Sequence, residues 1–65
     1  MSAQGAFAIY CAELYKSARH LTGRQMEALF TRCRVWDYLF DCFEALHTTG
    51  PEYIIQDLDE FIRAR

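Results

Sequence analysis

The sequence has few residues that break or cross-link a chain. Its 65 residues include one proline, three glycines and three cysteines. Scarce proline and glycine argue against linkers and disordered tracts. The cysteines are odd in number and form no Cys-X-X-Cys pair, and Cys11, Cys33 and Cys42 all fall on apolar sides of expected helices. They predict buried, reduced thiols in a cytoplasmic protein rather than a disulfide framework.

Long apolar runs are also missing. No stretch approaches the roughly 20 apolar residues that cross a bilayer. Residues 1–16 lack the basic start and the uninterrupted apolar run of a signal peptide. We therefore expect a cytoplasmic location and no membrane contact.

Apolar side chains are abundant: hydrophobic residues make up 52% of the chain and aromatic residues 15%. This composition predicts a single folded domain over residues 1–65 with a rich core. A domain of this size buries only about 60% of its unfolded surface, so apolar surface is left for a partner.

The charges are divided between the two halves of the chain. Residues 1–34 hold five basic and two acidic side chains, a net charge of +3, whereas residues 35–65 hold two basic and seven acidic ones, a net charge of −5. Such polarity draws the halves together or orients the molecule toward a charged partner.

Apolar spacing predicts an all-α fold with a small three-helix core. The first helix is expected over residues 3–19 and the second over residues 23–33, where Thr22 and Gln25 fit a capping box. Because one unbroken helix over residues 23–47, the alternative, would be unusually long, a tight turn at Arg34 is expected to precede the third helix, residues 35–47. Its apolar arc and the apolar faces of the first two helices comprise Phe7, Tyr10, Cys11, Leu14, Tyr15, Ala18, Met26, Leu29, Phe30, Cys33, Val35, Trp36, Leu39, Phe40, Cys42, Phe43, Leu46 and His47.

The segment after Pro51 has two interpretations. Tyr53, Ile54 and Ile55 favour an extended segment over the core. Asp57 would then cap a short C-terminal helix over residues 58–64. A continuous helix over residues 51–63 is the competing interpretation, since its apolar residues also keep helical spacing.

Enzymatic and ligand-binding chemistry finds little support. Cys42 and His47 are five residues apart, a poor spacing for shared metal ligands, so no metal or cofactor is expected. His47 is expected to cap the end of its helix, with pH sensing as the alternative. No nucleophile–base pattern predicts an enzyme.

Protein binding is the function that remains. Asp37, Asp41 and Glu44 share the polar face of the third helix and form what we call the acidic ridge. This ridge would repel phosphate, so nucleic-acid binding is not expected, although arginines cluster around the second helix and a self-associating DNA-binding module is the alternative. Ten aromatic rings exceed what the interior readily hides, although most of them would serve simply to complete the core. The predicted contacts to a protein partner or a second copy are the acidic ridge together with Trp36, Tyr38, Ile9 and Tyr53.

Two segments, residues 45–50 (ALHTTG) and 52–62 (EYIIQDLDEFI), are the most specific parts of a pattern that covers nearly the whole chain. By this pattern the chain resembles a family of short bacterial proteins grouped as a domain of unknown function. Its members are often encoded beside proteins similar to ADP-ribosyltransferases, which implies an antitoxin-like or accessory role toward an adjacent-gene effector. The family tends to have glycine where this chain has Arg34, so a turn there implies an uncommon backbone conformation.

Overall fold

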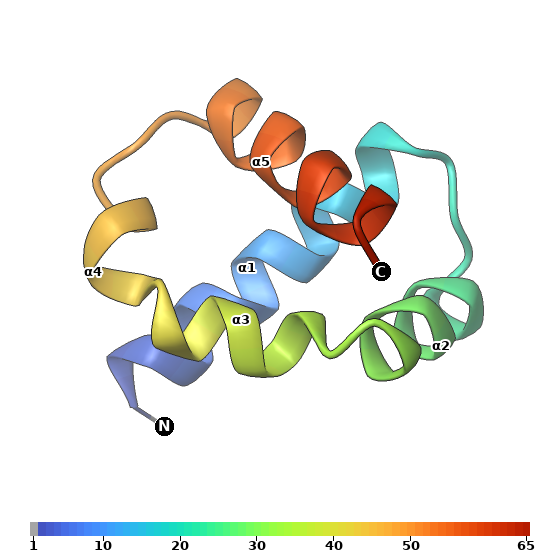
Figure 1. Ribbon diagram of the computed structural model, residues 1–65, viewed down its shortest axis with the longest axis horizontal. Coiled ribbons are helices and arrows are strands. Elements are labelled where there is room, and N and C mark those ends of the chain that lie inside the picture. Colours follow the sequence, from blue (N-terminus) through green and yellow to red (C-terminus); the bar gives the residue numbers. More distant parts are fainter. Residues whose placement is uncertain (1) are drawn as a thin grey trace.

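The computed structural model describes residues 2–65 and contains, within that range, five α-helices and no strand. They are α1 (Ala3–Ala18), α2 (Gly23–Arg32), α3 (Val35–Asp41), α4 (Phe43–Leu46) and α5 (Pro51–Arg63). Helices α2, α3 and α4 follow one another along one edge of the molecule, α5 returns along the opposite edge, and α1 packs against α2, α3 and α5 between them (Figure 1). The predicted all-α class is confirmed. None of the described helices has the length and apolarity required to cross a bilayer.

The start of α2 has the predicted capping box. The Gln25 amide donates to the Thr22 hydroxyl at 3.1 Å, and the Thr22 amide donates to the Gln25 side-chain oxygen at 2.9 Å. These two bonds satisfy amides that an isolated helix start leaves without partners.

The predicted turn at Arg34 is confirmed. Its backbone is left-handed, with φ 59° and ψ 37°, and it connects α2 directly to α3. His20 has the same conformation, with φ 56°, at the end of α1. There the Leu21 amide donates to the Lys16 carbonyl at 2.9 Å and the His20 amide to the Ser17 carbonyl at 3.4 Å, the bonding pattern of a Schellman motif. Glycine usually occupies this position because a β-carbon is strained there.

Replacing His20 by Gly should therefore stabilise the protein. We expect the free energy of unfolding to rise by about 0.5–1 kcal/mol, since relief of the left-handed strain is partly offset by the greater freedom of an unfolded glycine. Urea unfolding followed by circular dichroism measures the change. His20→Ala is the control because it keeps the β-carbon, and equal stability of the two variants would contradict the strain.

The predicted single helix over residues 35–47 is wrong in one respect, since it is divided at Cys42. Cys42 has φ −100° and ψ 14°, and it both ends α3 and precedes α4. Its carbonyl accepts from the amides of Ala45 and Leu46 at 3.1 and 2.9 Å. Leu46, which follows the break, is 4% exposed and belongs to the core. A straight helix would maintain the local hydrogen bonds equally well, so the break reflects tertiary packing.

The expected extended segment and short terminal helix are also wrong, and the competing continuous helix is correct. Helix α5 begins with Pro51 in its first turn, where a missing amide hydrogen leaves no bond unmade. Ile54 and Leu58, four residues apart, are 1% and 0% exposed. The helical spacing of the buried residues Ile54 and Leu58 outweighs the strand preference of the run Tyr53, Ile54 and Ile55. Asp57 consequently lies inside the helix and does not cap it.

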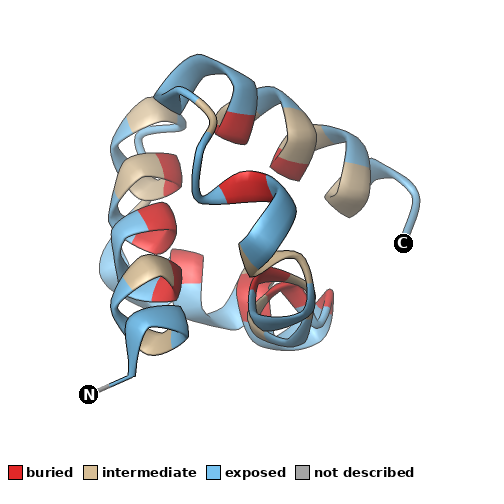
Figure 2. Ribbon diagram, turned by 90° about the vertical axis from the view of Figure 1, so that its left-hand side faces the viewer, coloured by how far each residue is buried: buried red, intermediate tan, exposed pale blue. Residues whose placement is uncertain are grey.

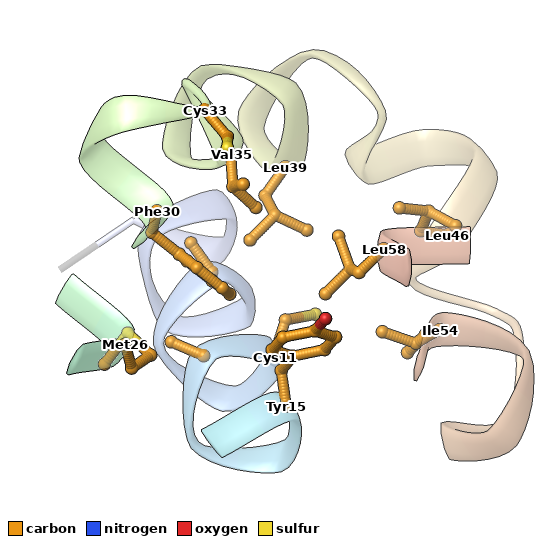
Figure 3. Close-up of a cluster of buried hydrophobic side chains, with 12 residues drawn as sticks. Cys11, Tyr15, Met26, Phe30, Cys33, Val35, Leu39, Leu46, Ile54 and Leu58 are labelled. Atoms are coloured by element: carbon orange, nitrogen blue, oxygen red, sulfur yellow. The ribbon is translucent and has the colours of Figure 1, made fainter. Parts of the chain in front are cut away.

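All five helices contribute to one core (Figure 3). Buried residues lie on the sides of the helices that face inward, and the outer sides are exposed (Figure 2). The core residues are Ala8, Cys11, Ala12, Tyr15, Met26, Phe30, Cys33, Val35, Leu39, Leu46, Ile54 and Leu58. Three residues assigned to apolar faces are instead on the surface: Phe40 and Tyr10 are 47% and 49% exposed, and His47 is also exposed.

Candidate functional site

An open groove of about 620 Å³ lies along α3 and beside the carboxyl end of α5. Half of its lining residues are aromatic and half are charged. They are Arg34, Trp36, Asp37, Tyr38, Phe40, Asp41, Phe61 and Arg65. Apolar walls with charged groups around them are typical of a surface that binds another macromolecule.

Trp36 and Phe40 differ in how firmly the fold holds them. The Trp36 ring packs edge-on against the fully buried Phe30, with ring centroids 5.2 Å apart and an interplanar angle of 69°. Phe40, one helical turn further along α3, is 47% exposed and makes no aromatic contact with another ring in the described chain. Trp36 is therefore anchored by the core, while Phe40 offers its surface to solvent or to a partner.

Tyr38 forms a rigid wall of the groove. Its ring stacks on Phe61 with centroids 3.9 Å apart, and its hydroxyl donates to a carboxylate oxygen of Asp57. Burial, reinforced by the hydrogen bond to Asp57, raises the pKa of the Tyr38 phenol well above its ordinary value of 10.0. The Arg65 guanidinium lies 4.3 Å from the centre of the Phe61 ring, a cation–π contact. These contacts fix the position of the α5 end against α3.

The acidic side chains of the groove differ in their pairing. Arg34 Nη2 lies 3.1 Å from Asp37 Oδ2, and both side chains are largely exposed. Within residues 2–65, neither Asp41 nor Glu44 takes part in an ion pair. Exposed ion pairs contribute little to stability, so the charges here matter chiefly for recognition.

The structure brings together four of the seven predicted contact residues: Trp36, Asp37, Tyr38 and Asp41 line one groove. The other three predicted residues, Ile9, Glu44 and Tyr53, are exposed but lie outside its lining. Because the helix is divided at Cys42, the acidic ridge is not one continuous helix face.

Sequence reasoning missed the other four residues of this site, which are Arg34, Phe40, Phe61 and Arg65. Phe61 and Arg65 are four residues apart near the end of the chain, and only the packing of α5 against α3 brings them to the groove. For Phe40, the sequence did carry a signal. Phe40 lies at the margin of the apolar arc, where helical spacing is equally compatible with an exposed and a buried side chain.

Other reactive groups are committed to the fold. Cys11 is fully buried, and burial raises the pKa of its thiol to about 11, so the reactive thiolate is disfavoured. His47 Nδ1 lies 2.7 Å from the Phe43 carbonyl and donates to it. This carbonyl also accepts from the His47 amide at 2.9 Å, so the bond does not cap a free carbonyl as expected. In the part of the chain that the structure describes, no three or more His, Cys, Asp or Glu residues gather as a metal site would require.

The comparisons with known proteins identify a family whose function is unknown. A family model described as "Protein of unknown function (DUF3791)" matches residues 6–65. Neither the curated proteins nor the solved structures contain a match.

Proposed function

This chain belongs to the DUF3791 family of proteins of unknown function, and on that premise we propose that it is a non-enzymatic protein-interaction module that binds through the α3 groove. The exposed ring of Phe40 carries the proposal. An aromatic side chain can bury about 150–250 Å², and such rings dominate the energetics of interfaces. Trp36 and Tyr38, which line the same groove, are held in place by Phe30 and Phe61, so a partner meets a preorganised surface.

Two partners fit such a module. One is a second copy of the chain, and the other is the adjacent-gene effector implied by the family resemblance, toward which the module would act as an antitoxin or accessory protein. The free thiols of Cys11, Cys33 and Cys42 support a reducing compartment, so the proposal places the interaction in the cytoplasm.

The DNA-binding alternative is less well supported. Arg24 and Arg32 are exposed on α2, which favours contact with phosphate. However, α3, the helix that would follow α2 into a DNA groove, exposes Asp37 and Asp41. Their carboxylates would repel the phosphate backbone.

A matched pair of surface variants tests the proposal. Phe40 and Ile9 are 47% and 48% exposed, but only Phe40 lines the groove. Phe40→Ser should abolish stoichiometric recovery of the bound protein from cells of the source organism, whereas Ile9→Ser should retain it. The recovered proteins are quantified by mass spectrometry, and circular dichroism checks that both variants are folded. Equal recovery by both variants would contradict the proposal, and groove-dependent recovery of DNA would favour the alternative.

A further inference from the structure

The charges of the groove are separated along α3. Arg34 stands at the beginning of this helix and Asp41 at its end, about 10 Å apart for seven residues at 1.5 Å each. Arg65 reaches the groove from the carboxyl end of the chain, and Figure 1 shows that end on the side of the molecule where α3 begins. Glu44 follows on α4, beyond the end of α3. Because Arg34 is paired with Asp37, the basic end of the groove owes its net charge to Arg65 and the acidic end owes its charge to Asp41, with Phe40 and Trp36 between the two ends.

This arrangement is complementary to itself. A two-fold rotation perpendicular to α3 places the basic end of one copy beside the acidic end of the other. In a two-fold interface every contact occurs twice, so both pairs of ends are matched at the same time. A parallel arrangement would instead place like charges beside each other.

We propose that the α3 groove is a homodimer interface in which α3 packs antiparallel against α3 of a second copy. The inference rests on the proposed function and names its partner. Phe40 covers the aromatic surface of the second copy, and Arg65 lies opposite Asp41 of the second copy. Helices packed in this way have axes about 8–10 Å apart, a distance that side chains of this size bridge.

Asp37 lies near the centre of the proposed interface, but its charge does not repel that of Asp37 in the second copy. Its carboxylate is already paired with Arg34 of the same chain at 3.1 Å, so two unpaired like charges do not meet at the two-fold axis. Asp41, which lacks such a partner within the described chain, is the carboxylate left to pair across the interface. The aromatic centre and charged margins correspond to the usual anatomy of an interface.

Charge exchange provides a direct test. Arg65→Glu and Asp41→Arg should each raise the dimer dissociation constant about tenfold or more, since each places like charges together twice. An equimolar mixture of the two variants should restore the dimer, because each introduced charge then faces an opposite one and the second native pair is kept. Glu27→Arg, a change of the same size on the exposed side of α2, should have no effect.

Analytical ultracentrifugation gives the readout, starting at about 100 μM so that a micromolar dimer is populated. A monomeric wild type that still recovers another protein through Phe40 would overturn the dimer and leave the proposed function intact. A dimer unaffected by the charge variants and by Phe40→Ser would place the interface elsewhere and overturn the dimer proposed here. Weakening by each single variant without recovery in the mixture would also overturn the pairing.

Discussion

Replacing Phe30 by Ala should lower the free energy of unfolding by about 3–5 kcal/mol, the usual range for removing a buried phenylalanine ring. Phe30 is 0% exposed, and its ring packs against Tyr15 at a centroid distance of 5.8 Å and against Trp36 at 5.2 Å. The substitution leaves a cavity among these rings, which belong to α1, α2 and α3. Because a chain of this length has about 3–10 kcal/mol of stability in total, the variant should be largely unfolded at 37 °C.

The matched control is Phe40→Ala, which removes the same atoms from a ring that is 47% exposed. Its stability should change by no more than about 0.5 kcal/mol, since Phe40 is half exposed and does not belong to the core. Urea unfolding followed by circular dichroism at low protein concentration compares the two variants in the monomer. Similar losses at both positions would contradict the assignment of Phe30 to the core and Phe40 to the surface.

The part of the fold that depends on local chemistry was predictable from sequence. The capping box at Thr22 and the main span of α1 follow from residues close together in the chain. The turn at Arg34 was expected only because an unbroken helix over residues 23–47 would be unusually long, since no nearby residue signals a helix end. The break at Cys42 was not predictable in this way. Nothing near Cys42 stops a helix, since neither glycine nor proline lies within five residues of it, and Leu46 beyond the break is still buried in the core.

The candidate site was likewise predictable only where it depends on residues close together in the chain. Trp36, Tyr38, Asp37 and Asp41 were expected together because they share one short helix. Tyr53 and Ile9 were chosen for their expected exposure alone. Exposure does not indicate to which part of the surface a residue belongs. The second wall of the groove comes from the end of α5. Its placement depends on contacts between segments 23 residues apart in sequence, such as the Tyr38–Phe61 stack.

Asp59 joins α5 to the end of α1 through hydrogen bonds that the sequence did not indicate. Its carboxylate accepts from the Tyr15 hydroxyl at 2.6 Å and from Arg19 Nε at 3.2 Å, and it forms an ion pair with the Arg19 guanidinium. Tyr15 and Arg19 lie at the end of α1, and Asp59 lies in α5. Since Tyr15 is 5% exposed, loss of this acceptor leaves its hydroxyl poorly solvated.

The same group makes stability depend on pH. The hydrogen bonds from Arg19 hold the pKa of Asp59 below its ordinary value of 3.8 in the folded state. A depressed folded pKa stabilises the protein above the unfolded pKa, and this contribution is lost as pH falls from about 4 through the folded pKa. Burial and the hydrogen bond to Asp59 raise the pKa of the Tyr15 phenol from 10.0 to about 12, so its contribution is lost as pH rises through that range.

Replacing Asp59 by Ala should therefore lower the free energy of unfolding by about 1–3 kcal/mol at pH 7, because a buried hydroxyl loses its charged acceptor. The difference from wild type should shrink as pH falls from about 4 through the depressed folded pKa of Asp59, because the wild-type carboxylate itself becomes protonated over that range. Urea unfolding at several pH values measures both effects. Glu60→Ala, at the exposed neighbouring position, is the control and should change little. In a Tyr15→Phe background the loss should fall to what the Arg19 contact alone contributes. An undiminished loss there would mean that Asp59 stabilises the α1–α5 contact without Tyr15.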